Sequence, residues 1–236
     1  MGQVPPTESI PLLLVGGGRL ARHLGFYLEL EGLPFASWRR CDDVAFEPLR
    51  DRAERVALLI CDDAIEPFLE RYRDGDRRVW IHCSGSLTTP LAEGVHPLMA
   101  FGPELYDLDT YRRVPFVCER GRRPLAELFP GLGNPRFTVD PVDKALYHAL
   151  CVLAGNGTTL LWQRAFAGFN KLGLPREALL PFLDRVARNL AVSPDPLTGP
   201  LARGDRLTID RNLEALAGDP YGEVYRALAG ARLETP

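Results

Sequence analysis

Residues 10–21 of the chain read IPLLLVGGGRLA, an apolar run that ends in three glycines and leads into a helix-forming segment. A short apolar run between turn residues is typical of a buried parallel strand. The pattern Gly16-x-Gly18-x-x-Ala21 then matches the turn that joins strand to helix in dinucleotide-binding folds. Gly16 permits the tight turn, Gly18 lets a pyrophosphate approach the backbone, and Ala21 allows the helix to pack closely on the strand.

This turn predicts that the chain binds a dinucleotide, because the N-terminus of the following helix offers amide donors to a phosphate. A glycine turn that serves only the fold is the alternative. The residues expected to contact the cofactor here are Gly16, Gly18, Arg19, Leu20 and Ala21.

Strand and helix patterns alternate along the first part of the chain and then give way to helices alone. Strands are expected at residues 10–15, 33–38, 55–61, 78–82, 95–99, 114–118 and 135–139, with helices at 19–31 and 63–73 between them. Later helices are expected at 142–172, 175–190, 208–217 and 221–229, with a loop rich in proline and glycine at 193–204. The pattern predicts a doubly wound α/β domain at residues 1–139 and an all-helical domain at 140–236.

The end of the second expected strand favours NADP over NAD. NAD-binding sites usually place an acidic residue there for the ribose 2′-hydroxyl. This strand instead ends in Arg39 and Arg40, and a guanidinium pairs well with a 2′-phosphate. A solvated arginine pair is the alternative for Arg39. We also assign Asp62, at the start of the helix expected at residues 63–73, to cofactor binding.

Composition limits the partners and the location of the chain. With 28 basic and 31 acidic residues the net charge is -3, which gives no electrostatic case for nucleic acid or an anionic membrane. No apolar run is long enough to span a bilayer, and the first residues lack the features of a signal peptide, so we expect a soluble cytoplasmic protein. The five cysteines are widely spaced and never form a CxxC pair, which favours free thiols and no metal site.

Four further segments carry a family resemblance. They are residues 81–87 (IHCSGSL), 94–101 (GVHPLMAF), 143–149 (DKALYHA) and 197–205 (LTGPLARGD). Together they resemble Rossmann-like proteins with a DUF2520 helical domain, within the superfamily of 6-phosphogluconate dehydrogenase, ketopantoate reductase and pyrroline-5-carboxylate reductase. The resemblance implies a reductase-like fold, an active site between the two domains and a homodimer formed by the helical domain.

The resemblance also points to one helix as the wall opposite the nicotinamide. In those reductases this helix carries a lysine and, one turn later, an asparagine. Here Lys144 and His148 stand at that spacing and share a helical face, and Asn156 lies two further turns along. Lys144 is one of only two lysines in an arginine-rich chain, which marks the position as one that arginine does not fill. We therefore expect Lys144 and His148 to handle protons, with an exposed lysine–histidine pair as the alternative.

The remaining candidates are expected at the carboxyl edge of the sheet or in the late loop. Ser84 is a candidate catalytic residue, which we expect to bind substrate or carboxamide, and Gly85 would let the ring approach. His96, Asn156 and Arg203 are candidate substrate-binding residues, with Arg203 as a clamp for an acidic substrate group. A structural histidine explains His96 equally well, and Asp205, beside Arg203, is expected to cap the following helix. The leading hypothesis is an NADP-dependent oxidoreductase that acts on a small carbonyl or imine. A non-catalytic dinucleotide sensor is the main alternative, and a hydrolase that uses Ser84 is the third.

Overall fold

The computed structural model describes residues 8–75 and 77–234, so the first residues, on which the signal-peptide expectation rests, lie outside the described part. The chain divides into two compact units, residues 1–161 and 162–236. The division falls inside the long helix that begins at Thr158.

Within the described residues, seven strands of the first unit form one sheet in the order β2-β1-β3-β4-β5-β6-β7. They are β1 (Leu13–Val15), β2 (Ala36–Trp38), β3 (Arg55–Leu58), β4 (Val79–His82), β5 (Glu93–Pro97), β6 (Phe116–Glu119) and β7 (Arg136–Val139). Neighbouring strands run parallel except β5 and β6, which pair antiparallel. The first five strands therefore form the doubly wound sheet that the alternating pattern predicted.

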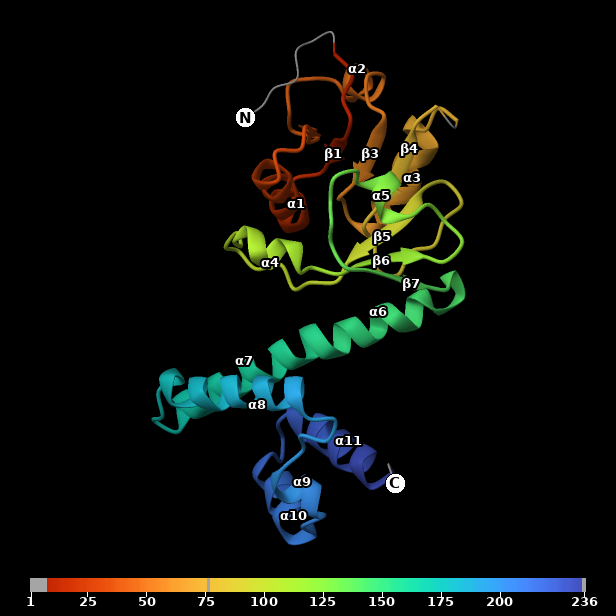
Figure 1. The fold of residues 1–236 in the computed structure, drawn as a ribbon. Coiled ribbons are helices and arrows are strands. Elements are labelled where there is room, and N and C mark those ends of the chain that lie inside the picture. The colour runs from red at the N-terminus through yellow and green to blue at the C-terminus, as the bar shows by residue number, and fades with distance from the viewer. Residues whose placement is uncertain (1–7, 76, 235–236) are drawn as a thin grey trace. The chain divides into compact units, whose positions relative to one another are not determined.

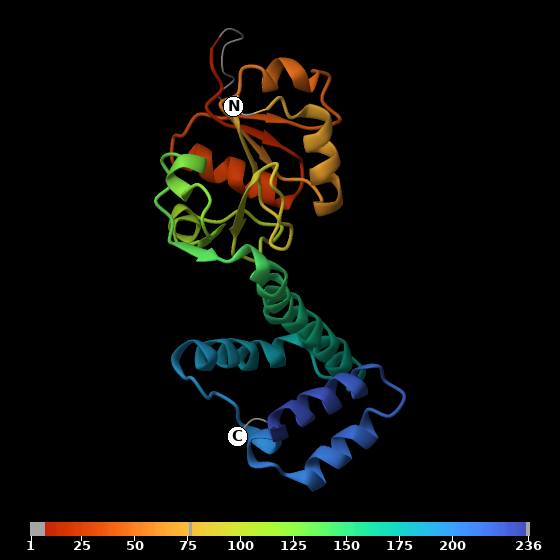
Figure 2. The same ribbon diagram turned by 90° about the vertical axis from the view of Figure 1, so that its right-hand side faces the viewer.

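Helices cover both faces of this sheet. They are α1 (Arg19–Leu30), α2 (Phe46–Arg50), α3 (Asp62–Tyr72), α4 (Leu108–Arg112) and α5 (Leu125–Leu128). In Figure 1, α1 and α3 lie on opposite sides of β1 and β3, and Figure 2 shows α3 flanking the sheet. Alternate residues of β1 explain the two layers, because Leu12 and Leu14 pack with α1 whereas Leu13 and Val15 pack with α2 and α3.

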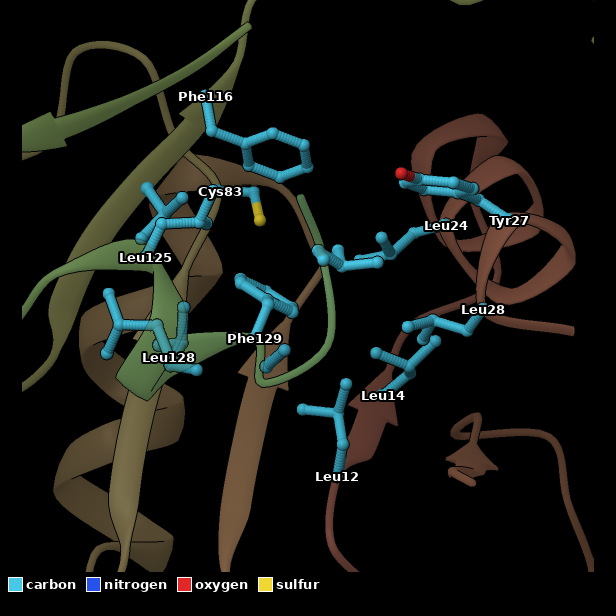
Figure 3. Packing of buried hydrophobic residues seen from close by; sticks show 14 of the residues in the cluster. Leu12, Leu14, Leu24, Tyr27, Leu28, Cys83, Phe116, Leu125, Leu128 and Phe129 are labelled. Carbon is cyan, nitrogen blue, oxygen red and sulfur yellow. The ribbon is translucent and has the colours of Figure 1, made fainter. Parts of the chain in front are cut away.

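The α1 face of the sheet holds the larger core. Figure 3 shows the side chains of α5 and the residue after it, among them Leu128 and Phe129, facing those of Leu14, Leu24 and Leu28. Tyr27 and Phe116 are also buried in this cluster. Burial of apolar area at about 25 cal/mol per Å² is the main force that holds such layers together. This packing fixes α1, and with it the glycine turn that precedes it.

Three short helices and one strand direction differ from the sequence-based expectation. The helices α2, α4 and α5 have only four or five residues each, too few for a helical period to show in the sequence. All strands were expected to be parallel, whereas β6 reverses direction against β5. Several strands are also shorter than expected, since β1 keeps only residues 13–15 in the ladder.

The long helical stretch expected at residues 142–172 is broken into turns of different pitch. It contains a 3-10 turn (Pro141–Asp143), α6 (Lys144–Val152), a π-helical turn (Leu153–Gly157) and α7 (Thr158–Lys171). A π-helical turn holds more residues than an α-helical turn and is often found at functional sites. Residues beyond Val152 therefore do not keep the angular spacing of a regular α-helix.

The second unit is helical in all its described regular elements. After α7 come a 3-10 turn (Arg176–Leu179), α8 (Leu180–Val192), α9 (Gly199–Arg203), α10 (Arg206–Ala215) and α11 (Tyr221–Glu234). The expectation of a plain loop at residues 193–204 is wrong at its end, where α9 forms with Pro200 in its first turn and Gly204 as a left-handed cap. No helix among the described residues is long and apolar enough to cross a membrane.

Candidate functional site

The glycine turn has the geometry that a phosphate cradle needs. Gly16 has a φ of 135°, and a Cβ there would lie 2.2 Å from the backbone oxygen of Leu59. Gly18 caps α1 without any side-chain hydrogen bond, and a Cβ on it would meet no heavy atom within 4 Å. The exposed N-terminus of α1 thus opens onto free space, where its amides can reach a phosphate. These residues fit a dinucleotide pyrophosphate.

Arg39 lies directly beside this turn. A Cβ on Gly17 would lie 3.1 Å from Cδ of Arg39, so the arginine stem packs against the glycines. Its Nε donates to Asp42 at 3.1 Å, and its side chain is 58% exposed. Such an exposed ion pair contributes little free energy, so a phosphate can compete for the guanidinium. Asp42, however, places a carboxylate near the end of β2, where NAD-binding sites usually have an acidic residue.

The side chains of Asp62 and Ser84 hydrogen-bond to each other and do not both face an open site. Oγ of Ser84 donates to Asp62 Oδ2 at 2.6 Å and accepts from the backbone amide of Leu87 at 2.9 Å. Ser86 donates to the same carboxylate oxygen at 3.2 Å. The hydroxyl of Ser84 is buried and its hydrogen is committed to Asp62. These contacts favour a role for both residues in tying the turn after β4 to the start of α3.

Three side chains converge above Gly85, and we call His96, Tyr147, His148 and Gly85 the histidine cluster. Nδ1 of His96 lies 2.7 Å from the Tyr147 hydroxyl, and the rings of His96 and His148 meet edge to face at 5.8 Å. A Cβ on Gly85 would lie 2.3 Å from Cδ2 of His148. The space over Gly85, expected to admit a nicotinamide ring, therefore holds the imidazole of His148.

Lys144 lies below this cluster in a buried ion pair. Its Nζ is 2.5 Å from Oε1 of Glu119 and also donates to the carbonyl of Leu87. Both side chains are 2% exposed. Gly94 makes room for them, because a Cβ there would lie 2.2 Å from Glu119 Oε1 and 2.6 Å from Lys144 Nζ. The alternative of an exposed lysine on a helix surface is wrong, since the ammonium is enclosed by protein.

His82, at the end of β4, is fully buried, and neither of its ring nitrogens has a hydrogen-bond partner within the described residues. Burial and the charge of Lys144 lower its pKa to about 3. Burial, His148 and Lys144 likewise lower the pKa of His96 to about 4. Both imidazoles are therefore neutral at physiological pH. His23 is engaged elsewhere, bonded to Tyr111 and to the carbonyl of Gly102.

Acidification from pH 7 to pH 5 is expected to lower the free energy of unfolding by about 2 kcal/mol through His82 alone. In the unfolded chain His82 titrates at its ordinary pKa of 6.5 and takes up a proton in this interval, whereas the folded chain does not. Its stabilising effect is present above pH 6.5 and is lost as the pH falls toward 3. Urea unfolding at pH 7, 6 and 5 measures the slope, and His82→Phe should flatten it. Equal slopes in both proteins would contradict the expectation.

Two candidate residues, Asn156 and Arg203, lie away from the histidine cluster in the sequence, and both are exposed. Asn156 is exposed within the π-helical turn, where the regular spacing used to align it with His148 does not hold. Arg203 ends α9 in the second unit, and its side chain is 67% exposed. The neighbouring Asp205 caps α10 by accepting from the amide of Thr208, as the sequence suggested. Among the described residues no metal-binding group of three or more ligands forms.

Sequence reasoning missed two residues of this site. Tyr147 lies between the two candidates of α6 and bonds His96, and its place in the 143–149 segment was a usable signal. Glu119 is the partner of Lys144, yet a single acidic residue at the end of a strand gives no local sign of burial. Both residues acquire their place through contacts between distant segments.

Residues 118–232 match the family described as "Domain of unknown function (DUF2520)". The match begins inside β6, so it includes Glu119 and the whole of α6. No curated protein matches this chain.

Solved structures share the fold of this chain at low identity. A candidate NADP oxidoreductase from Bacteroides fragilis has a TM-score of 0.78 at 22% identity, covering 96% of this chain and 99% of that one. A reductive aminase from Aspergillus terreus, in complex with NADPH and ethyl levulinate, has a TM-score of 0.62 at 15% identity, with 95% and 93% covered. The pyrroline carboxylate reductase of Plasmodium falciparum, with NADP bound, has a TM-score of 0.60 at 12% identity, with 96% and 97% covered. At these identities the likeness establishes the fold.

Proposed function

We propose that this chain is an NADP-dependent oxidoreductase that reduces a small carbonyl or imine compound. One observation carries the proposal: the glycine turn and the histidine cluster stand at the same edge of the sheet. Strands β1, β3, β4 and β5 are parallel, so the turn after β1, Gly85 after β4 and His96 near the end of β5 all lie where doubly wound folds bind ligands. Oxidoreductases of the same fold that bind NADP support the choice of cofactor.

Each group at this edge has a proposed task. Amides of residues 16–21 would hold the pyrophosphate, and Arg39 the 2′-phosphate. When bound, the cofactor supplies the hydride. His96 and His148 would contact the substrate, while Lys144 acts through its charge and its bond to Leu87. The proton-transfer role predicted for Lys144 thus becomes one of positioning.

Arg39→Ala is expected to weaken NADPH binding by about 10- to 100-fold and to leave NADH binding unchanged, since charge-assisted bonds to a phosphate contribute about 1.5 to 3 kcal/mol. Trp38 adjoins Arg39, so tryptophan fluorescence can follow both titrations. Asp42→Ala is the matched control: it frees the same guanidinium and should keep or improve NADPH binding. If Asp42→Ala weakens NADH binding and Arg39→Ala leaves NADPH binding unchanged, the cofactor would be NAD and not NADP.

The alternative of a dinucleotide sensor shares the cofactor site but predicts no turnover. His148, where the reductases that the chain resembles have asparagine, motivates it. NADPH oxidation across a panel of ketones and cyclic imines tests the difference. Tight NADPH binding without NADPH oxidation in the presence of any of these compounds would favour the sensor. Absence of NADPH binding would contradict both hypotheses.

We also propose a homodimer. On the first unit, Val142, Leu146, Leu150 and Leu153 are each more than half exposed and follow one another at intervals of four, four and three residues. Leu146 and Leu150 lie one turn apart on one face of α6, and Val142 and Leu153 extend the exposed apolar surface into the 3-10 and π-helical turns on either side. An exposed apolar surface of this kind is typical of one that packs against another chain. Light scattering should give twice the mass of the 26.2 kDa chain, and Leu146→Glu with Leu150→Glu should give the monomer. A monomeric wild-type chain would contradict the proposal.

A cytoplasmic location is proposed from the cysteines. All five are free thiols, and Cys41 and Cys61 are exposed. Exposed free thiols are typical of proteins from reducing compartments.

A further inference from the structure

The hydrogen bond between Tyr147 and His96 joins α6 to β5, and its direction depends on the tautomer of His96. A phenol is a stronger donor than a thiol, and an imidazole nitrogen is a stronger acceptor than sulfur. Tyr147 therefore donates to Nδ1 of His96, at 2.7 Å, in preference to the neighbouring Cys151. Because Nδ1 accepts, the ring proton of a neutral His96 must be on Nε2.

Both members of this pair keep their neutral forms. Burial, together with His148 and Lys144, lowers the pKa of His96 to about 4, against a smaller opposite effect of Asp62. Burial and Cys151 raise the pKa of Tyr147 above its ordinary value. Neither group changes charge near neutral pH, so the arrangement presents one N–H and no charge.

The Nε2–H of His96 is left for a ligand. Among the described residues, Nδ1 of His96 has a hydrogen-bond partner and Nε2 has none. Both ring nitrogens of His82 are buried without a partner, whereas Nε2 of His96 is not buried in this way. The ring is half-buried at the edge where ligands bind and stands edge to face with His148.

We propose that Tyr147 fixes His96 as a neutral donor whose Nε2–H binds a carbonyl oxygen, so that the site selects carbonyl compounds over protonated imines. This rests on the proposed reductase function and narrows its substrate class. A carbonyl oxygen accepts a hydrogen bond, whereas a protonated imine nitrogen has no lone pair and would set its own N–H against that of His96. In the reaction, the carbonyl carbon receives the hydride, and the C=O electron pair moves onto oxygen, which takes its proton from solvent. His96 keeps its proton throughout, and Tyr147 is a positioning residue.

The first part of the proposal, that Tyr147 fixes His96 as an Nε2–H donor, can be tested without turnover by measuring the tautomer of His96. Nitrogen-15 NMR of histidine-labelled full-length chain, assigned with His96→Gln, should show His96 protonated at Nε2 at pH 7.5. Tyr147→Phe should shift it toward a mixture of tautomers, while Tyr106→Phe, which removes a hydroxyl bonded to Ala100 and Gly102, should not. A proton on Nδ1 in the wild-type chain, or no change in Tyr147→Phe, would overturn the proposal.

A matched pair of ligands tests the second half. Uncharged 2-pyrrolidinone and protonated 2-iminopyrrolidine share one ring and differ in presenting a carbonyl oxygen or a cationic N–H group. Titrated into the chain saturated with NADP⁺, the lactam should shift the His96 Nε2 signal and bind about 10-fold or more tightly than the amidinium. Equal or tighter binding of the amidinium, or no response of His96 to the lactam, would overturn the selectivity. A chain that holds this tautomer yet never oxidises NADPH would count against the reductase function alone.

Discussion

Replacing Lys144 with methionine is expected to lower the free energy of unfolding by about 3 to 5 kcal/mol. The substitution keeps most of the side-chain volume but removes the partner at 2.5 Å from the buried carboxylate of Glu119, which keeps only the longer ion pair to Nε of Arg122 at 3.8 Å. It also removes the donor to the carbonyl of Leu87. A buried charge that loses its hydrogen-bonded partner costs far more than a lost surface ion pair, because no water can replace the partner. Urea unfolding at pH 7 measures the loss.

The chain offers a matched control and a rescue for this substitution. Lys171, the other lysine, is exposed at the end of α7, and Lys171→Met should change stability by less than about 0.5 kcal/mol. The double variant Lys144→Met with Glu119→Leu replaces the pair by apolar side chains and should regain most of the loss. If Lys144→Met unfolds like the wild type, the ion pair is not the stabilising element that its burial indicates. Turnover by a well-folded double variant would show that the ammonium is dispensable for chemistry.

Gly16→Ala is expected to lose about 3 kcal/mol of stability or more, and NADPH binding with it. The new Cβ would lie 2.2 Å from the carbonyl oxygen of Leu59 and force an alanine into a φ of 135°. Backbone strain and overpacking each cost about 1 to 3 kcal/mol. The obstacle is main chain of the neighbouring segment, so no side-chain rotation can relieve it. Thermal unfolding and NADPH titration give the two readouts.

Gly18→Ala separates the structural role of the turn from its proposed ligand. Gly18 has φ of -74°, and its Cβ would meet no protein atom within 4 Å, so the fold should tolerate alanine within about 0.5 kcal/mol. If a pyrophosphate occupies that space, NADPH affinity should still fall by about 10-fold or more. Unchanged NADPH affinity in a stable Gly18→Ala would indicate that the glycines serve only the turn.

Much of the first unit could be predicted from local pattern. The helix after the glycine turn was expected at residues 19–31 and occupies Arg19–Leu30, because an apolar face and a stop at Gly32 are both local signals. The short helices escaped prediction because four or five residues hold barely one turn. The antiparallel pairing of β6 also escaped, since strand direction depends on the connection and not on the residues of the strand.

The sequence pointed to some residues of the candidate site, but not to Tyr147 or Glu119 and not to the contacts between them. Lys144 was singled out by its rarity and His148 by its spacing, and both lie on α6 as expected. The sequence could not show that Lys144 meets Glu119, 25 residues away, or that His96 meets Tyr147, 51 residues away. Such pairs form only when separate segments pack together, and the burial that then results sets the charge state of each group.

The sequence by itself determined the strand, the glycine turn and the helix of residues 10–30, because each depends on backbone freedom and apolar spacing within a few residues. It also placed a histidine and a lysine one turn apart on a helix. Only the tertiary structure decided that the lysine is enclosed in an ion pair and that His148 fills the space over Gly85. The physical reason is that desolvation and steric exclusion are properties of an assembled interior, to which distant segments contribute together.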